Sequence, residues 1–341
     1  MNKLPSRIIP LALVLASCGG KAIRTYDLGT PASQQAEAYI EAERPKAARD
    51  AKRIVIPYFQ VEFVQQSSAS ANVMGQKAGA GLGSSSSRVK TTVTLSGVAP
   101  TQFQAITNDF YDAVVADLKG AGVDVVSLDQ MRASPEFKTL SGHGCKDSPD
   151  TIEHFDNISK FYAPHGMQVY YLPKDERFSG AATGKKSGPS IIGAFSQMGA
   201  GISGVYGGGA YKFVDEEVAL AKALGAKVLR VRVVIDFADV SAEGHSGAQG
   251  GTTSSHSAVR ISFPAKDTFY QFNGSDGEGG FSLKIPLVSG DGFAEKKDGG
   301  YNSGGGKNWE AAANGTAYEA SVRKHLEAFR GLVMARLKSS L

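Results

Sequence analysis

One order of elements constrains the fold most and occurs twice in the chain: an amphipathic helix, a glycine turn and a strand. Residues 100–118 form the first helix, glycines follow it, and a short buried strand is expected at 123–128. The second helix begins with Asp215 as its N-cap and ends at Gly225, and a long strand is expected at 227–237. The first helix has apolar residues at spacings of three and four: Phe103, Ile106, Phe110, Val114 and Leu118. This alternation predicts an α/β or α+β fold in which helices cover a mixed sheet.

The rest of the chain adds further strands and a closing helix. Strands are expected where β-branched and aromatic residues concentrate, at 54–63, 88–95, 259–263 and 281–287. Thr316 and Glu319 have the spacing of a capping box and open the last helix. Its apolar stripe consists of Tyr318, Val322, Leu326, Phe329, Val333 and Leu337. We therefore expect a single folded domain over residues 53–341.

Composition limits the partners and the loops of this domain. Of its 341 residues, 42% are hydrophobic, which is enough to bury a core. The formal net charge is only +4 and no block of Lys and Arg occurs, which argues against nucleic acid as a partner. Glycine is abundant, with 41 residues. Long Gly- and Ser-rich insertions are expected at 65–87 and 178–213, the first of them flexible.

Residues 1–17 have the features of a signal peptide. Lys3 and Arg7 form a basic start, and residues 8–15 form an apolar run that is too short to span a bilayer. We therefore expect the protein to be exported from the cytoplasm. Outside the cytoplasm a nucleotide cofactor would not be available to it.

Residues 15–18, Leu-Ala-Ser-Cys, resemble the lipobox of bacterial lipoproteins. The resemblance implies that Cys18 is acylated, with palmitate among its chains, and that residues 18–52 tether the domain to the membrane. Several acyl chains on one cysteine make a stable anchor. Gly19 stands where an Asp would favour retention at the inner membrane in these families, so the outer membrane is implied, with the domain in the periplasm or on the cell surface. An ordinary secretory signal with an incidental cysteine is the alternative.

The order of elements is similar to that of the curli-secretion lipoprotein family and of the N-terminal domain of the periplasmic Tol-system translocation protein. The segments at 54–63, 109–128 and 219–237 and the closing helix carry this resemblance, whereas the two long insertions depart from it. It supports the preferred hypothesis, a non-enzymatic role in envelope assembly, secretion or surface-structure biogenesis. A homo-oligomer or other envelope proteins would then be the partners, and no cofactor is expected.

Residues 187–211 carry no charge and allow two interpretations. Four small residues recur every four positions and would let two helices approach closely: Ser196, Ala200, Gly204 and Gly208. The segment would then contact lipid or pack against its copy in an oligomer. The preferred interpretation is a glycine-rich loop with a short buried helix, because glycine lowers helix stability.

Motifs for nucleotides and metals are incomplete. Residues 180–187 and 79–83 lack the spacing and the following helix that a phosphate-binding loop needs. A group of potential metal ligands has no zinc-site spacing, and a polar loop is the better interpretation: His143, Cys145, Asp147, Asp150 and His154. We therefore expect neither nucleotide nor metal.

Two alternatives to the preferred hypothesis remain open. Residues 244–248 resemble the G-x-S-x-G turn of α/β-hydrolases, so a lipid-anchored hydrolase would use Ser246 with His256 as base and Asp267 to orient it. No helix is expected after Ser246, which favours a turn between two strands instead. The other alternative is a calcium-dependent surface binding module in the loops of residues 272–306, with four acidic residues as ligands: Asp276, Glu278, Asp291 and Asp298.

Overall fold

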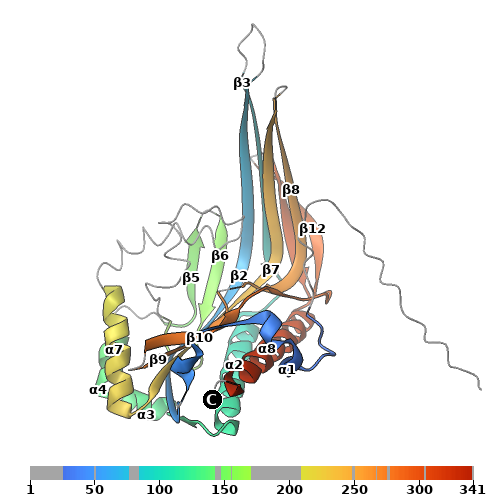
Figure 1. The fold of residues 1–341 in the computed structure, drawn as a ribbon. Helices are drawn as coiled ribbons and strands as arrows, with labels where there is room; N and C mark the ends of the chain where they lie inside the picture. The colour runs from blue at the N-terminus through green and yellow to red at the C-terminus, as the bar shows by residue number, and fades with distance from the viewer. Residues whose placement is uncertain are drawn as a thin grey trace, which may run out of the picture.

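The chain folds into an α+β domain with a large, open, mixed sheet (Figure 1). The computed structural model describes residues 26–49, 51–76, 84–142, 147–154, 156–169, 209–247, 250–265, 267–274, 277–302 and 305–339. Of the two fold classes left open by the sequence, α+β is therefore confirmed. None of the helices in these residues is long and apolar enough to cross a membrane.

The strands of the described residues form one connected arrangement around a parallel pair. They are β1 (Ile40–Glu43), β2 (Arg53–Gln76), β3 (Ser84–Ser96), β4 (Asp124–Val125), β5 (Asp150–His154), β6 (Asn157–Tyr162), β7 (Lys227–Gly247), β8 (Gly250–Phe263), β9 (Phe269–Gly274), β10 (Gly277–Leu283), β11 (Leu287–Val288), β12 (Ala294–Tyr301) and β13 (Lys307–Ala313). The main path runs β1-β10-β9-β7-β2-β3-β13-β12. At its centre, β2 and β7 pair in parallel from Ile54 opposite Lys227 to Phe63 opposite Ile235.

The helices cover the lower part of this sheet (Figure 1). They are α1 (Ala32–Tyr39), the short 3-10 helix η1 (Pro45–Ala48), α2 (Pro100–Gly120), α3 (Leu128–Ala133), α4 (Pro135–Ser141), α7 (Gly209–Leu224) and α8 (Gly315–Lys338). The helix expected at 100–118 and the closing helix are both confirmed. Gly225 follows α7 with a φ of 58°, a conformation that suits glycine and ends the helix as expected.

Aromatic side chains join α2 and α8 to one face of β2. The ring centroid of Phe59 lies 5.3 Å from that of Phe110, and the centroid of Phe63 lies 4.6 Å from that of Phe103. Tyr318 of α8 contacts Phe103 edge to face at 5.9 Å. The three-and-four spacing seen in the sequence of α2 therefore places its apolar stripe on the sheet.

Residues 18–52 were expected to form a tether. Most of the residues of this segment that the structure describes are instead part of the folded domain. Ile40 is 1% exposed, Tyr39 is buried, and β1 pairs with the edge of β10. Gly279 of β10 permits this approach, because a Cβ there would lie 2.3 Å from the carbonyl oxygen of Arg44. The tether interpretation is thus wrong for residues 32–49, since small and aromatic residues there pack instead of remaining in solvent.

The flexible insertion expected at 65–87 is also wrong for its described part. Residues 65–76 continue β2, and β3 begins at Ser84. Ala69, Ala71 and Val73 alternate with Ser70 and Asn72, and such alternation fits a pleated strand although the composition resembles a linker. Residues 178–208 of the second insertion lie outside the described residues, and α7 begins at Gly209.

Three local expectations need correction. The strand expected at 123–128 is only the two residues of β4, because Ser127 caps α3 by accepting a hydrogen bond from the backbone N–H of Gln130. Asp215 lies inside α7 and does not cap it. Finally, the N-cap of α8 is Asn314 and not the expected Thr316.

The box of Thr316 and Glu319 expected at the start of α8 does not form this cap. The side chain of Asn314 accepts from the N–H of Ala317 at 3.1 Å, so the cap lies two residues earlier than expected. The carboxylate of Glu319 instead accepts a hydrogen bond from Arg323 at 2.9 Å. Asn, like Thr, is a favoured capping residue, so the sequence alone leaves the choice open.

Candidate functional site

Two long hairpins, β2–β3 and β7–β8, rise together from the helix-covered base (Figure 1). We call their upper parts the hairpin pair: residues 67–76 and 84–91 of the first hairpin, and residues 238–247 and 250–258 of the second. β2 has 24 residues and β7 has 21, whereas an ordinary strand has about five or six. Such length without covering helices makes the hairpin pair the candidate functional site.

The hairpin pair forms because β2 and β7 separate above their parallel segment. Up to Phe63 and Ile235 the two strands pair with each other. Beyond these residues β2 pairs with β3, and β7 pairs with β8. A register shift between Asp236 and Ala238 marks the point where β7 changes partner.

Small and hydroxyl-bearing side chains fill the contact between the two hairpins. The Thr91 hydroxyl donates to Ser255 Oγ at 2.6 Å, and the hydroxyls of Ser87 and Thr253 are 2.9 Å apart. Gly244 lies against Val73, where a Cβ would be 2.1 Å from Val73 Cγ2. The hairpins therefore touch closely through small side chains, and hydrogen bonds of this kind contribute only about 1 kcal/mol each.

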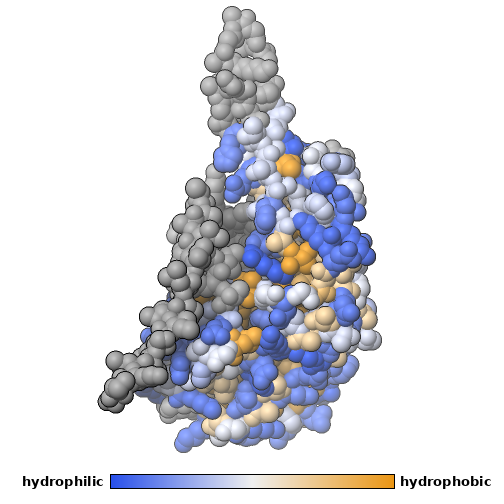
Figure 2. Space-filling view, turned by 90° about the vertical axis from the view of Figure 1, so that its right-hand side faces the viewer, coloured by the Kyte–Doolittle hydropathy of each residue, from blue (hydrophilic) through white to orange (hydrophobic). Residues whose placement is uncertain are grey.

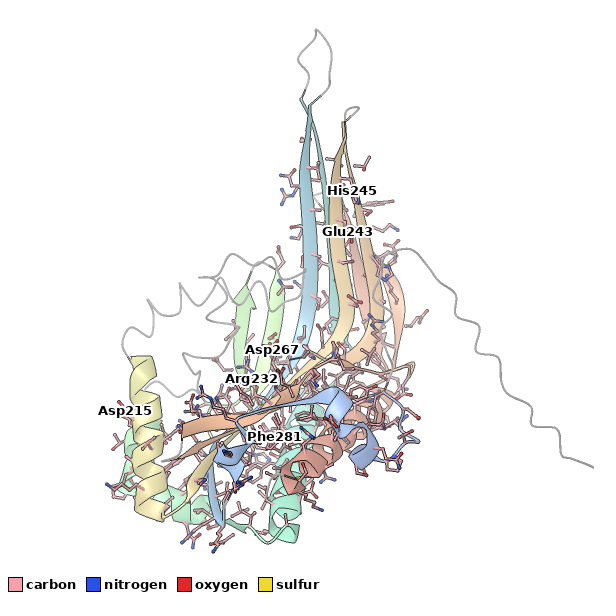
Figure 3. The ribbon with its side chains drawn as sticks, viewed as in Figure 1. Asp215, Arg232, Glu243, His245, Asp267 and Phe281 are labelled. Atoms are coloured by element: carbon pink, nitrogen blue, oxygen red, sulfur yellow. The ribbon has the colours of Figure 1, made fainter. Side chains whose placement is uncertain are left out.

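The outer faces of the hairpin pair are polar as well. Asn72, Arg88 and Glu243 are exposed there. Figure 3 shows Glu243 and His245 high on β7, away from the base. Figure 2 shows that hydrophilic residues predominate on the side of the molecule where β12 lies. The inner faces instead carry small side chains, among them the buried Ala69 and Val240. Strands with a polar outer face and a narrow inner face of small residues have a weakly specified register and pair readily with other strands.

The carbonyl oxygens of Lys90 and Ser257 accept hydrogen bonds from side chains of the β12–β13 region. Above these two residues the strand edges of the hairpin pair remain open within the described part of the chain. The N–H of Ser68 donates to Asn157 Oδ1 at 2.7 Å, and after it β2 pairs only with β3. From Ala238 onward β7 pairs only with β8, and β8 meets β11 only at Ser262 and Phe263. Edges of this length carry rows of backbone donors and acceptors that another strand can pair with.

A buried polar layer lies below the hairpin pair, on the face of β2 and β7 opposite the aromatic core. Arg232 donates to Glu62 at 2.9 Å, and both side chains are at most 1% exposed. The Arg230 guanidinium donates to Glu217 of α7. Removing one partner of a buried ion pair leaves an uncompensated charge and is strongly destabilising. This layer therefore fixes the position of α7 against the sheet.

Asp236 occupies the junction between this polar layer and the hairpin pair. Its Oδ1 accepts from the N–H of Ala238 at 3.2 Å and lies 3.5 Å from Ser67 Oγ. Burial raises the pKa of the Asp236 carboxyl to about 7, and the nearby charge of Glu62 acts in the same direction. A proton on this group therefore favours the folded junction near neutral pH.

The residues of the hydrolase alternative are not brought together. In β7, Ser246 lies opposite Gly251, whereas His256 lies opposite Ser241, five positions away, which corresponds to about 17 Å along the strand. Asp267 is buried at the base, far below Glu243 and His245 (Figure 3). Residues 244–247 belong to β7 and not to the expected turn, and the next described element is the strand β8, so no helix presents Ser246.

The acidic residues of the calcium alternative also lie apart. Glu278 is near Arg230 at 3.5 Å, and Asp298 pairs with Lys307 at 2.9 Å. Asp291 approaches Lys324 and Ser321, and Asp276 lies outside the described residues. Each of the three described carboxylates thus has its own local partner. Among the described residues no three His, Cys, Asp or Glu side chains converge as a metal site.

Several sequence-predicted sites lie outside the described residues. These are the signal peptide with Cys18, His143 and Cys145 of the polar loop, residues 79–83 and 180–187, and the small-residue series Ser196, Ala200, Gly204 and Gly208. Sequence reasoning missed the hairpin pair itself. The signal that could have found it is the alternation of Ala and Val with Ser and Asn over residues 69–73.

Comparisons with known proteins do not assign the chain to a family. No protein-family model matches the chain, and neither the curated proteins nor the solved structures give a significant match. The similarity to the curli-secretion and Tol-system proteins stays a prediction from element order.

Proposed function

We propose that this chain is an outer-membrane lipoprotein, anchored through Cys18, that acts without enzymatic chemistry in envelope assembly, secretion or surface-structure biogenesis. It does so as a homo-oligomer whose copies pair through the edges of the hairpin pair. The single observation that carries the proposal is the pair of long hairpins with polar outer faces and open edges. The lipobox at residues 15–18 supports the anchor.

A second copy is the partner that the hairpin edges fit best. Each chain offers two different hairpins, so the first hairpin of one copy can meet the second hairpin of the next copy. Contacts of this head-to-tail kind close into a ring when the rotation between copies permits it. Edge pairing needs backbone hydrogen bonds and no apolar patch, which agrees with the polar side chains on the outer faces.

The charges of the two hairpins support the same pairing. Arg88 is exposed on the first hairpin and makes no ion pair within the described residues. Glu243 is 71% exposed on the second hairpin and lies 3.8 Å from His245. Opposite charges on neighbouring strands stabilise a sheet by about 0.2–1 kcal/mol per pair, so they favour unlike hairpins as neighbours.

Mass spectrometry and light scattering of protein extracted from membranes in mild detergent test this proposal. We expect an acylated N-terminal Cys18 and a particle with a defined number of copies. The Cys18→Ala variant should lose the acyl mass and leave the membrane fraction. An acylated monomer would overturn the assembly role, and a wild-type protein without acyl chains would overturn the location.

A further inference from the structure

A pocket of about 350 Å³ lies at the lower end of the hairpin pair, where β3 and β8 face the β12–β13 hairpin. Its lining includes Val89, Ser257, Lys296, Gly306, Lys307 and Trp309. Four strands, β3, β8, β12 and β13, therefore contribute to one concave surface. Its composition, two cations around one indole ring, differs from that of the neutral hydroxyl contacts above it.

Both lysines lie on the indole ring of Trp309. Lys296 Nζ is 4.1 Å from the ring centroid, and Lys307 Nζ is 4.8 Å from it. The two ammonium groups are thus separated by no more than the sum of these distances. Lys296 also donates to the carbonyl of Ser257 at 2.7 Å and to its hydroxyl at 2.6 Å, which fixes the ammonium at the pocket wall.

The charges of the pocket are not balanced. Asp298 pairs with Lys307 at 2.9 Å, but Lys296 contacts no carboxylate in the part of the chain that is described. Burial and the neighbouring charge of Lys307 lower the pKa of Lys296. An anion placed between the two ammonium groups would relieve this repulsion and would restore a counter-charge to Lys296.

We propose that this pocket binds a phosphate-type oxyanion between Lys296 and Lys307, with Trp309 as its apolar wall. Lysine binds phosphate as a point charge, and two lysines suit a multiply charged group better than the single charge of a carboxylate. The phosphate can belong to a soluble ester or to a lipid headgroup. The inference does not depend on the oligomer proposed above.

Trp309 provides a direct readout because it is the only tryptophan of the chain. The full-length protein is titrated with sodium phosphate, and with sodium chloride at matched ionic strength, while tryptophan emission is recorded. We expect a saturable change with phosphate that chloride does not reproduce. An equal response to both salts would overturn the proposal.

Neighbouring lysines on β12 supply a matched pair of variants. Lys296→Gln should weaken phosphate binding at least about tenfold, as loss of a charged contact does. Lys297→Gln removes an exposed charge that faces Glu295 at 3.8 Å and should leave the titration unchanged. If Lys296→Gln does not fold, Lys307→Gln gives the same test. Wild-type affinity in a folded Lys296→Gln or Lys307→Gln variant would contradict the assignment.

Vesicles distinguish the two sources of phosphate. Emission of Trp309 is compared after addition of phosphatidylglycerol vesicles and of phosphatidylcholine vesicles, since a lipid anchor would insert into both. A change with phosphatidylglycerol that Lys296→Gln abolishes identifies a lipid headgroup. A response to inorganic phosphate alone identifies a soluble ester. No response to either probe refutes the proposal.

Discussion

Asp236 joins the buried polar layer to the hairpin pair. It lies where β7 leaves β2 and joins β8, with its carboxyl near Ser67 and the N–H of Ala238. A carboxyl in such a place binds a proton more tightly in the folded chain than in the unfolded chain. The stability of the junction is therefore linked to pH through this residue.

The pH dependence of stability tests the role of Asp236. Its pKa rises from 3.8 to about 7 on folding, so its contribution to the free energy of unfolding falls as pH rises between these values and is constant above them. We expect Asp236→Asn to gain stability relative to wild type between about pH 5 and about pH 8. The gain should be on the order of 2 kcal/mol, less than the full shift implies because the side chain keeps some solvent contact.

Denaturant titrations at a series of pH values measure this difference. Asp112→Asn, at an exposed position of α2, controls for the loss of a surface carboxylate. Parallel stability curves for wild type and Asp236→Asn would show that the carboxyl is already charged at low pH.

Among the elements, the N-terminal segment differs most from its sequence-based expectation. α1 and β1 pack on α8 and β10, although residues 18–52 were expected to be a tether. Strong apolar periodicity made α2 and α8 predictable. A short segment such as β1 becomes a strand only because it pairs with the edge strand β10. The close approach at Gly279 that admits this segment depends on tertiary contacts and is not visible in local sequence.

The packing of this segment can be tested by a pair of truncations. Ile40→Ala should lower the free energy of unfolding by about 2–4 kcal/mol, because Ile40 is 1% exposed and its loss leaves a cavity. Leu28→Ala is the control in the same segment, because Leu28 is 44% exposed, and it should have little effect. Equal, small effects of both substitutions would restore the tether interpretation.

The two hairpins together give the molecule its open edges, and they were the hardest feature to predict. Ser, Ala and Gly between residues 65 and 87 have the composition of a linker, and only the pairing of Gln66 to Gln76 with Thr94 to Ser84 makes them strands. The candidate catalytic residues could be judged from the sequence, because Ser246 lacked a following helix. Oligomeric state depends on contacts between copies, which a single sequence does not encode in its local pattern.

A charge exchange between the hairpins tests the central claim most directly. The particle mass in mild detergent is compared for wild type, Arg88→Glu, Glu243→Arg and the double variant, with Lys52→Glu as a control on the exposed base. We expect a defined oligomer for wild type and the control, smaller particles for each single variant, and recovery in the double variant, because opposite charges then face each other again. A monomeric wild type, or single variants that keep the wild-type mass, would contradict assembly through the hairpin pair.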